Sequence, residues 1–120
     1  MAPVHDAAKQ NDVAALLAVL EGDPALVHAE SSLHKRQDTP LHFACEAGAA
    51  EAAQLLLDRG AVIDKGNAFE VTSLMLACCA GRAEVVSLLL ARGADPTLPS
   101  SASWTALIEA AAGLERPGSD

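Results

Sequence analysis

The sequence predicts an all-α repeat fold, in which helix–turn–helix units stack side by side as a solenoid. The first observation is a period of 33 residues, at which Thr39, Thr72 and Thr105 follow one another. Further residues share this period: Leu41 with Leu74 and Leu107, Ala44 with Ala77 and Ala110, Gly48 with Gly81, and Gly60 with Gly93. The second observation is a composition of 51% hydrophobic but only 2% aromatic residues, which suits layers of alanine and leucine between closely spaced helices. Stacked repeats bury their apolar faces against one another, so a chain of 120 residues needs no central core.

The unit is clearest between residues 39 and 60. Thr39 can cap a helix with its hydroxyl, and Pro40 suits the first helical position, where no N–H is required. Gly48 ends this helix, and a second helix beginning at Glu51 is stopped by Gly60, because glycine readily adopts the left-handed conformation of a helix C-terminus. The unit is therefore a helix, a turn and a second helix.

A terminal repeat precedes this unit. Residues 2–8 align with residues 39–45 at an offset of 37, so we expect the chain to start directly inside a first helix. Polar residues suit a terminal repeat, whose outer face meets water: Asp6, Lys9, Gln10 and Asn11. A second helix is expected from Asp12 to about Glu21. Residues 25–36 are expected to form an extended connector. It is longer than the later connectors, because the offset of 37 exceeds the repeat period of 33.

Two further units follow. The third repeat begins at Thr72, and its second helix, over residues 84–92, has the most apolar face in the chain. The last repeat supplies one helix, over residues 105–112, before glycine and proline end the pattern. We expect the missing outer helix to leave the C-terminal edge uncovered, unless the tail folds back or another molecule covers it.

The opening Thr39-Pro40-Leu41-His42-Phe43-Ala44, with helix pairs at a period of about 33, resembles the ankyrin repeat and its T-P-L-H-x-A motif. The resemblance covers nearly the whole chain and implies a slightly curved, right-handed solenoid with short β-hairpin-like fingers. It divides the single domain 1–120 as follows: a cap repeat over about 1–34, repeats over about 35–67 and 68–100, a partial repeat over about 101–113, and a tail over 114–120.

The resemblance also implies roles for single residues. His5 and His42 stand at matched positions, at which the family's histidine ties neighbouring fingers together by hydrogen bonds. Met75 replaces this histidine in the third repeat, so we expect that repeat to be more loosely linked. Gly66 and Asn67 are expected at the tip of the second finger, because both residues tolerate a positive φ angle.

Net charge indicates which classes of partner are favoured, and cysteine content indicates the cellular compartment. The 16 acidic and 8 basic residues give a net charge of −8, which opposes nucleic acids and anionic membranes. This charge favours a partner with a basic surface; the alternative is that it only keeps the solenoid soluble. Cys45, Cys78 and Cys79 stand at helical positions and are expected to be reduced, with the first two buried. With no secretion signal or membrane span in the sequence, we expect a cytoplasmic protein.

The sequence carries no recognisable catalytic chemistry. No nucleophile with a base, carboxylate pair or glycine-rich phosphate loop stands out, so neither enzymatic activity nor a cofactor is expected. His28 and His34 lie with Lys35 and Arg36 in the long connector, but no acidic or cysteine ligand follows at a recognisable spacing. A solvated loop is favoured there over a metal site.

The family's concave face, formed by the finger tips and the exposed side of the inner helices, is where the resemblance places a protein partner. The candidate binding residues on it are Asp38, Phe43, Glu46, Phe69, Val71, Leu76, Cys79, Trp104 and Glu109. The apolar ones are expected to form an exposed diagonal; the alternative is that they pack into the fingers. The acidic ones, with Glu70, are expected to form a rim that steers a basic partner, while Lys9 and Arg59 lie away from the diagonal.

These observations predict a non-catalytic protein–protein interaction module that acts as a small regulator, inhibitor or effector. The alternative is a structural or assembly protein that self-associates through its incompletely capped C-terminal edge. The expected oligomeric state is a monomer or a weak homodimer formed through that edge.

Overall fold

The computed structural model describes residues 3–32 and 35–97. Within these residues the chain forms six α-helices and one 3₁₀ helix, with these bounds: α1 Pro3–Lys9, α2 Val13–Gly22, η1 Pro24–His28, α3 Pro40–Ala47, α4 Ala50–Asp58, α5 Ser73–Cys79 and α6 Ala83–Ala91. No strand occurs in the described ranges, so the fingers that they contain are loops and not β-hairpins. The predicted helical repeat is confirmed.

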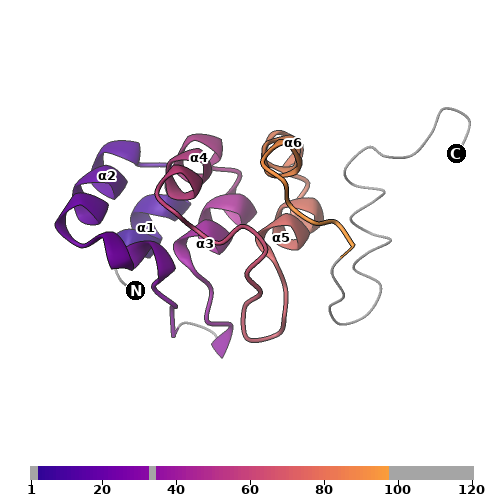
Figure 1. The fold of residues 1–120 in the computed structure, drawn as a ribbon, viewed down its shortest axis with the longest axis horizontal. Coiled ribbons are helices and arrows are strands. Elements are labelled where there is room, and N and C mark those ends of the chain that lie inside the picture. Colours follow the sequence, from indigo (N-terminus) through magenta and orange to yellow (C-terminus); the bar gives the residue numbers. More distant parts are fainter. Residues whose placement is uncertain (1–2, 33–34, 98–120) are drawn as a thin grey trace, which may run out of the picture.

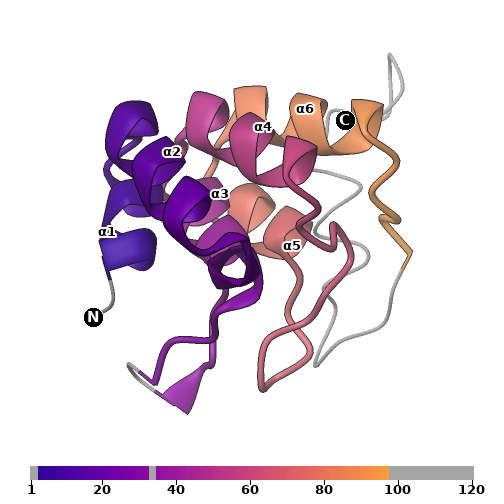
Figure 2. The same cartoon turned by 60° about the vertical axis from the view of Figure 1, so that its left-hand side comes forward.

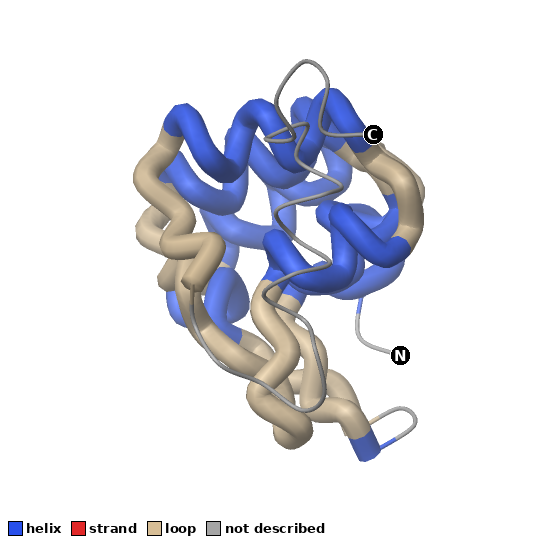
Figure 3. Tube along the Cα trace, turned by 90° about the vertical axis from the view of Figure 1, so that its right-hand side faces the viewer, coloured by secondary structure: helices blue, strands red, loops and turns tan. Residues whose placement is uncertain are grey.

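The helices form two rows, and the fingers leave the stack on one side (Figures 1 and 2). Helices α1, α3 and α5 form the inner row, in which α3 packs between the other two. Helices α2, α4 and α6 form the outer row, in which α4 contacts both neighbours. Viewed along the stack, the loops gather below the inner row (Figure 3).

Glycines end the helices where the sequence predicts. Gly48 and Gly81, after the inner helices α3 and α5, have φ angles of 79° and 75°, and Gly60 and Gly93, after the outer helices, have φ angles of 96° and 94°. A side chain is strained in this left-handed region, so the repeat period of glycine reflects a backbone requirement.

The core is a continuous set of apolar layers between the rows. Leu16, Leu56 and Leu89 of the three outer helices are completely buried. Ala44 and Ala77 of the inner row are also fully buried, and their small side chains let the inner helices approach closely. Leu56 and Leu89 stand one repeat period of 33 residues apart and so occupy equivalent buried positions in the second and third repeats.

The sequence suggested that the long connector is extended from its start, but the structure shows a helix there. Residues 24–28 form the helix η1, because Pro24 starts its first turn and Oδ1 of Asp23 accepts a hydrogen bond from the Ala25 amide at 3.2 Å. Local capping by Asp23 and Pro24 therefore starts η1. The offset of 37 residues between the first two repeats gives the length of the connector but does not reveal this helix.

The tip of the second finger also differs from the expectation. Neither Gly66 nor Asn67 has a positive φ angle, whereas Glu70 has one of 62°. Gly66 is needed for a different reason, since a Cβ atom there would lie 2.9 Å from the Cα atom of Glu70. The second finger therefore closes where the backbone of Gly66 lies close to the backbone of Glu70.

Several predictions concern residues outside the described ranges: His34, Trp104, Glu109, the helix over 105–112 and the tail over 114–120. The uncovered C-terminal edge and self-association through it belong to this group and stay predictions.

Candidate functional site

A hollow of about 530 Å³ lies where the inner helices meet the first finger, and we call it the groove. The described residues that line it are Lys9 and Gln10 at the end of α1, Arg36 and Asp38 of the finger, Phe43, Glu46 and Ala47 of α3, and Arg82 after α5. The groove therefore extends from the end of α1 across α3 to the turn after α5. Phe43 is half-buried in it, and its ring centroid lies 5.3 Å from that of His5 on α1, so a neighbouring helix supports the ring.

The structure brings together only part of the predicted partner-binding set. Asp38, Phe43 and Glu46 line the groove, whereas Phe69, which is 56% exposed, and the exposed Cys79 are not among its lining residues. Trp104 and Glu109 lie outside the described residues.

The predicted exposed apolar diagonal is wrong at two of its positions. Val71 and Leu76 belong to the apolar core and are only 8% and 7% exposed. The backbone of Val71 is held inside the finger by hydrogen bonds to Asn67 and His42. Residues 73–78 of α5 are all buried, because this helix packs against both α3 and α6.

The expected acidic rim is also changed, because Arg36 lies between two of its members. Nε of Arg36 is 2.9 Å from Oδ2 of Asp38, and Nη2 is 3.1 Å from Oε1 of Glu46. Asp38 is only 3% exposed, so it is not available on the surface as predicted. Sequence reasoning left Arg36 in a solvated loop, since the spacing of residues does not show that the finger folds back over α3.

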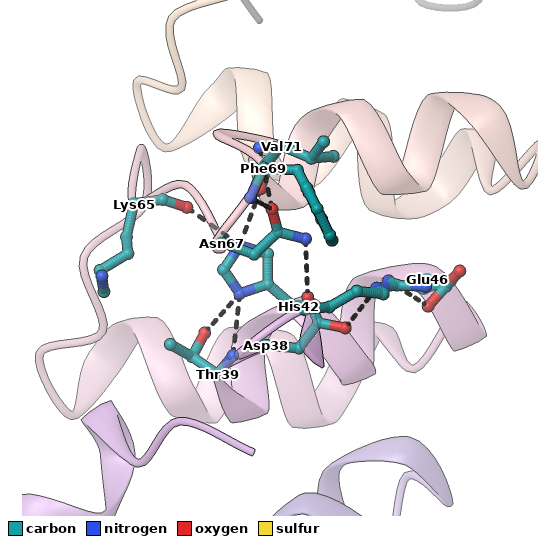
Figure 4. Close-up of polar contacts among 9 residues, drawn as sticks. Asp38, Thr39, His42, Glu46, Lys65, Asn67, Phe69 and Val71 are labelled. Atoms are coloured by element: carbon teal, nitrogen blue, oxygen red, sulfur yellow. Dashed lines mark hydrogen bonds and ion pairs between the residues drawn. The ribbon is translucent and has the colours of Figure 1, made fainter. Parts of the chain in front are cut away.

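Asn67 links the second finger to the first (Figure 4). Its Nδ2 donates to Oδ1 of Asp38 at 2.9 Å, and its Oδ1 accepts from the amides of Phe69 and Val71 at 2.8 and 3.1 Å. The amide of Ala68 donates to the Arg36 carbonyl at 2.7 Å, which joins the two backbones directly. The finger side of the groove is therefore held in place by buried hydrogen bonds.

His42 also joins the two fingers, because both of its ring nitrogens form hydrogen bonds with their backbone (Figure 4). Its Nδ1 accepts a hydrogen bond from the Thr39 amide at 2.9 Å, so the proton is on Nε2. Nε2 lies 3.0 Å from the Lys65 carbonyl and 3.1 Å from that of Val71. Burial lowers the pKa of His42, and the nearby charge of Asp38 opposes this shift only partly.

His5 makes the corresponding Nε2 contact one repeat earlier and donates to the Ala29 carbonyl at 2.7 Å, but within the described residues its buried Nδ1 has no hydrogen-bond partner. The predicted structural role of both histidines is confirmed. In the third repeat, Sδ of Met75 lies 3.4 Å from the Thr72 amide and so replaces Nδ1. A thioether has no second polar atom to replace Nε2.

Two further cations reach the groove, one on each side of α3. Lys9 is exposed in the last turn of α1 and lines the groove together with Phe43, so the expectation that it lies away from the diagonal is wrong. Arg82 follows α5, and its Nε donates to the Glu46 carbonyl at 3.0 Å. Its Cδ occupies space beside Gly48, where a Cβ atom would lie only 2.9 Å away.

The cysteines are placed as predicted, with Cys45 and Cys78 buried and Cys79 exposed. Burial raises the pKa of Cys45 to about 12 and that of Cys78 to about 11. Across residues 3–32 and 35–97, no three or more His, Cys, Asp or Glu side chains gather as metal ligands could. None of the helices described is both long and apolar enough to cross a membrane.

Comparisons with known proteins agree with this geometry. A family model described as ankyrin repeats (3 copies) matches residues 4–100. The crystal structure of the human ASB11 ankyrin repeat domain is similar, with a TM-score of 0.73 and 31% sequence identity over 82% of this chain. The chain spans only 43% of that domain. No curated protein matches the chain.

Proposed function

The chain belongs to the ankyrin repeat family, and on this premise we propose that it is a non-catalytic module that binds a protein partner through its concave face. Ankyrin repeats are generally protein–protein interaction modules. The finer proposal is that the groove is the centre of the contact and that the module serves as a small regulator, inhibitor or effector.

The observation that carries this proposal is the half-buried ring of Phe43 in a groove lined by charged side chains. An aromatic side chain that is already held in place loses little conformational entropy on binding, and such residues often dominate interface energies. His5 supports the ring on one side, and the linked fingers limit movement on the other. The groove is therefore prepared for binding before a partner arrives.

A reducing cytoplasmic location stays part of the proposal, supported by the use of Cys45 and Cys78 as buried apolar residues. A basic surface on the partner is supported by the net charge of −8. Association should then slow as salt is added, because ions screen long-range attraction.

The experiment that tests the function starts with the full chain as bait in an extract of its source cells. Calorimetry then measures the identified partner against Phe43→Ala, which should weaken binding by about 2 kcal/mol or more. Val62→Ala is the matched control, since Val62 is apolar and 55% exposed but does not line the groove. Equal loss in both variants, or none in Phe43→Ala, would place the binding face elsewhere.

A further inference from the structure

Building on the proposed function, we propose that the groove receives an extended acidic segment of the protein partner. An apolar side chain of this segment packs on Phe43, and one carboxylate lies at each end, against Lys9 and Arg82. The net charge of the chain favours a basic partner surface, but the residue that enters the groove is selected by the charges within it.

The first argument is the local charge. Among the described residues that line the groove, three are cationic and two are carboxylates: Lys9, Arg36 and Arg82 against Asp38 and Glu46. The groove therefore carries a net positive charge in a chain whose formal charge is −8.

The second argument is that both carboxylates already have a cationic partner within the chain. Arg36 contacts Asp38 at 2.9 Å and Glu46 at 3.1 Å, so these three side chains form one connected group. Asp38 is further satisfied by the amide of Asn67. The cations left to meet a ligand are Lys9 and Arg82.

The third argument is that Arg82 is positioned in advance. Its Nε is bound to the Glu46 carbonyl, and its stem lies against Gly48, a position that leaves no room for a Cβ atom. Within the described part of the chain, no hydrogen bond or ion pair occupies its two terminal nitrogens. A guanidinium that is fixed in this way can accept a carboxylate with little loss of side-chain entropy.

The order of these residues across the stack sets the form of the ligand. Lys9 comes from α1, Phe43 from α3 and Arg82 from the turn after α5, and α3 packs between α1 and α5. Packed helices lie about 8–10 Å apart, and an extended chain advances about 3.3 Å per residue. We therefore expect the two acidic residues to stand roughly five or six positions apart, with the apolar residue midway.

Acidic residues elsewhere in the chain do not override this preference. The Debye length is about 8 Å at physiological salt, so distant carboxylates act weakly on a ligand in direct contact with the groove. Glu84 lines a smaller neighbouring hollow together with Arg82, but the two form no ion pair among the described residues.

The test selects binders from a phage-displayed library of random 12-residue peptides on the full chain. The expected binders carry an apolar residue between two acidic ones and are lost with Phe43→Ala. In fluorescence anisotropy with one selected peptide, Lys9→Glu or Arg82→Glu should each weaken binding by about tenfold or more. Arg59→Glu, a charge reversal at an exposed arginine that does not line the groove, should change it by less than about twofold.

A charge swap separates recognition from damage to the fold. Replacing the peptide's acidic residue by lysine at the matched end should restore affinity for Arg82→Glu to within about threefold of the original pair. Basic or uncharged binders that still need Phe43 would overturn this inference and leave the proposed function standing. Binders that do not need Phe43, or no binders at all, would count against the groove itself.

Discussion

The side-chain amide of Asn67 lies 2.9 Å from the carboxylate of Asp38, and this contact joins two fingers that are 29 residues apart in the chain. Both side chains are buried, at 8% and 3% exposure. The wall of the groove is therefore a product of contact between neighbouring fingers, not a property of either finger alone.

Removing the Asn67 side chain should destabilise the fold. Asn67→Ala deletes one donor and one acceptor, and leaves Asp38 and the amides of Phe69 and Val71 without this partner. We expect a loss of about 2–3 kcal/mol in the free energy of unfolding, measured by chemical denaturation. Gln54→Ala, at an exposed position of α4, is the control and should change stability by less than about 0.5 kcal/mol.

The leucine layers should be the most sensitive part of the outer row. Leu56 and Leu89 are both fully buried, and truncation of either to alanine should lower the free energy of unfolding by about 2–5 kcal/mol. If the free energy of unfolding of either variant stays within about 0.5 kcal/mol of that of the original chain, either the cavity collapses or the layer is assigned wrongly. Val62→Ala, at a 55% exposed position, gives the baseline for loss of an apolar side chain.

His42 should make stability fall as the solution is acidified below neutral pH. Its pKa is lowered in the folded state, so the unfolded chain takes up a proton first, near the ordinary histidine pKa of about 6.5. Its contribution is thus complete above about pH 6.5 and is lost as the pH falls toward the lower folded-state pKa. The protonated ring could no longer accept the hydrogen bond of the Thr39 amide.

Denaturation midpoints between about pH 7.5 and 5.5 test this dependence. His42→Met is the matched variant, because Met75 occupies the equivalent position and accepts from the Thr72 amide. This variant should show a flatter pH dependence than the original chain. An unchanged slope in the variant, or stability that rises on acidification, would contradict the assignment.

The three thiols should react with an alkylating reagent at very different rates. Cys79 is exposed, whereas burial raises the pKa of Cys45 to about 12 and that of Cys78 to about 11, which leaves almost no thiolate at neutral pH. Mass mapping after brief labelling should find Cys79 modified first. Labelling in denaturant is the control, in which all three rates should converge; equal rates in the folded protein would contradict this orientation of α5.

The sequence alone determined the repeat architecture, because each feature that encodes it is local or periodic. Thr39 and Pro40 start α3, and glycines with a left-handed backbone end the helices of the second and third repeats. Burial of Leu56 and Leu89 follows from the same period, since equivalent residues face equivalent neighbours in a stack. The histidine contacts were predictable through the family motif, which places His5 and His42 at matched positions.

Only the tertiary structure decided which side chains form the groove and what charge it presents. Val71 and Leu76 were expected on the surface, but contacts with neighbouring elements bury them. Arg36 and Arg82 acquire their partners across finger–helix and repeat–repeat contacts, with Glu46 common to both. Such pairings depend on how far a finger bends and how closely two helices approach. Residue spacing encodes the period of a repeat, but it does not encode the distance between side chains of different repeats.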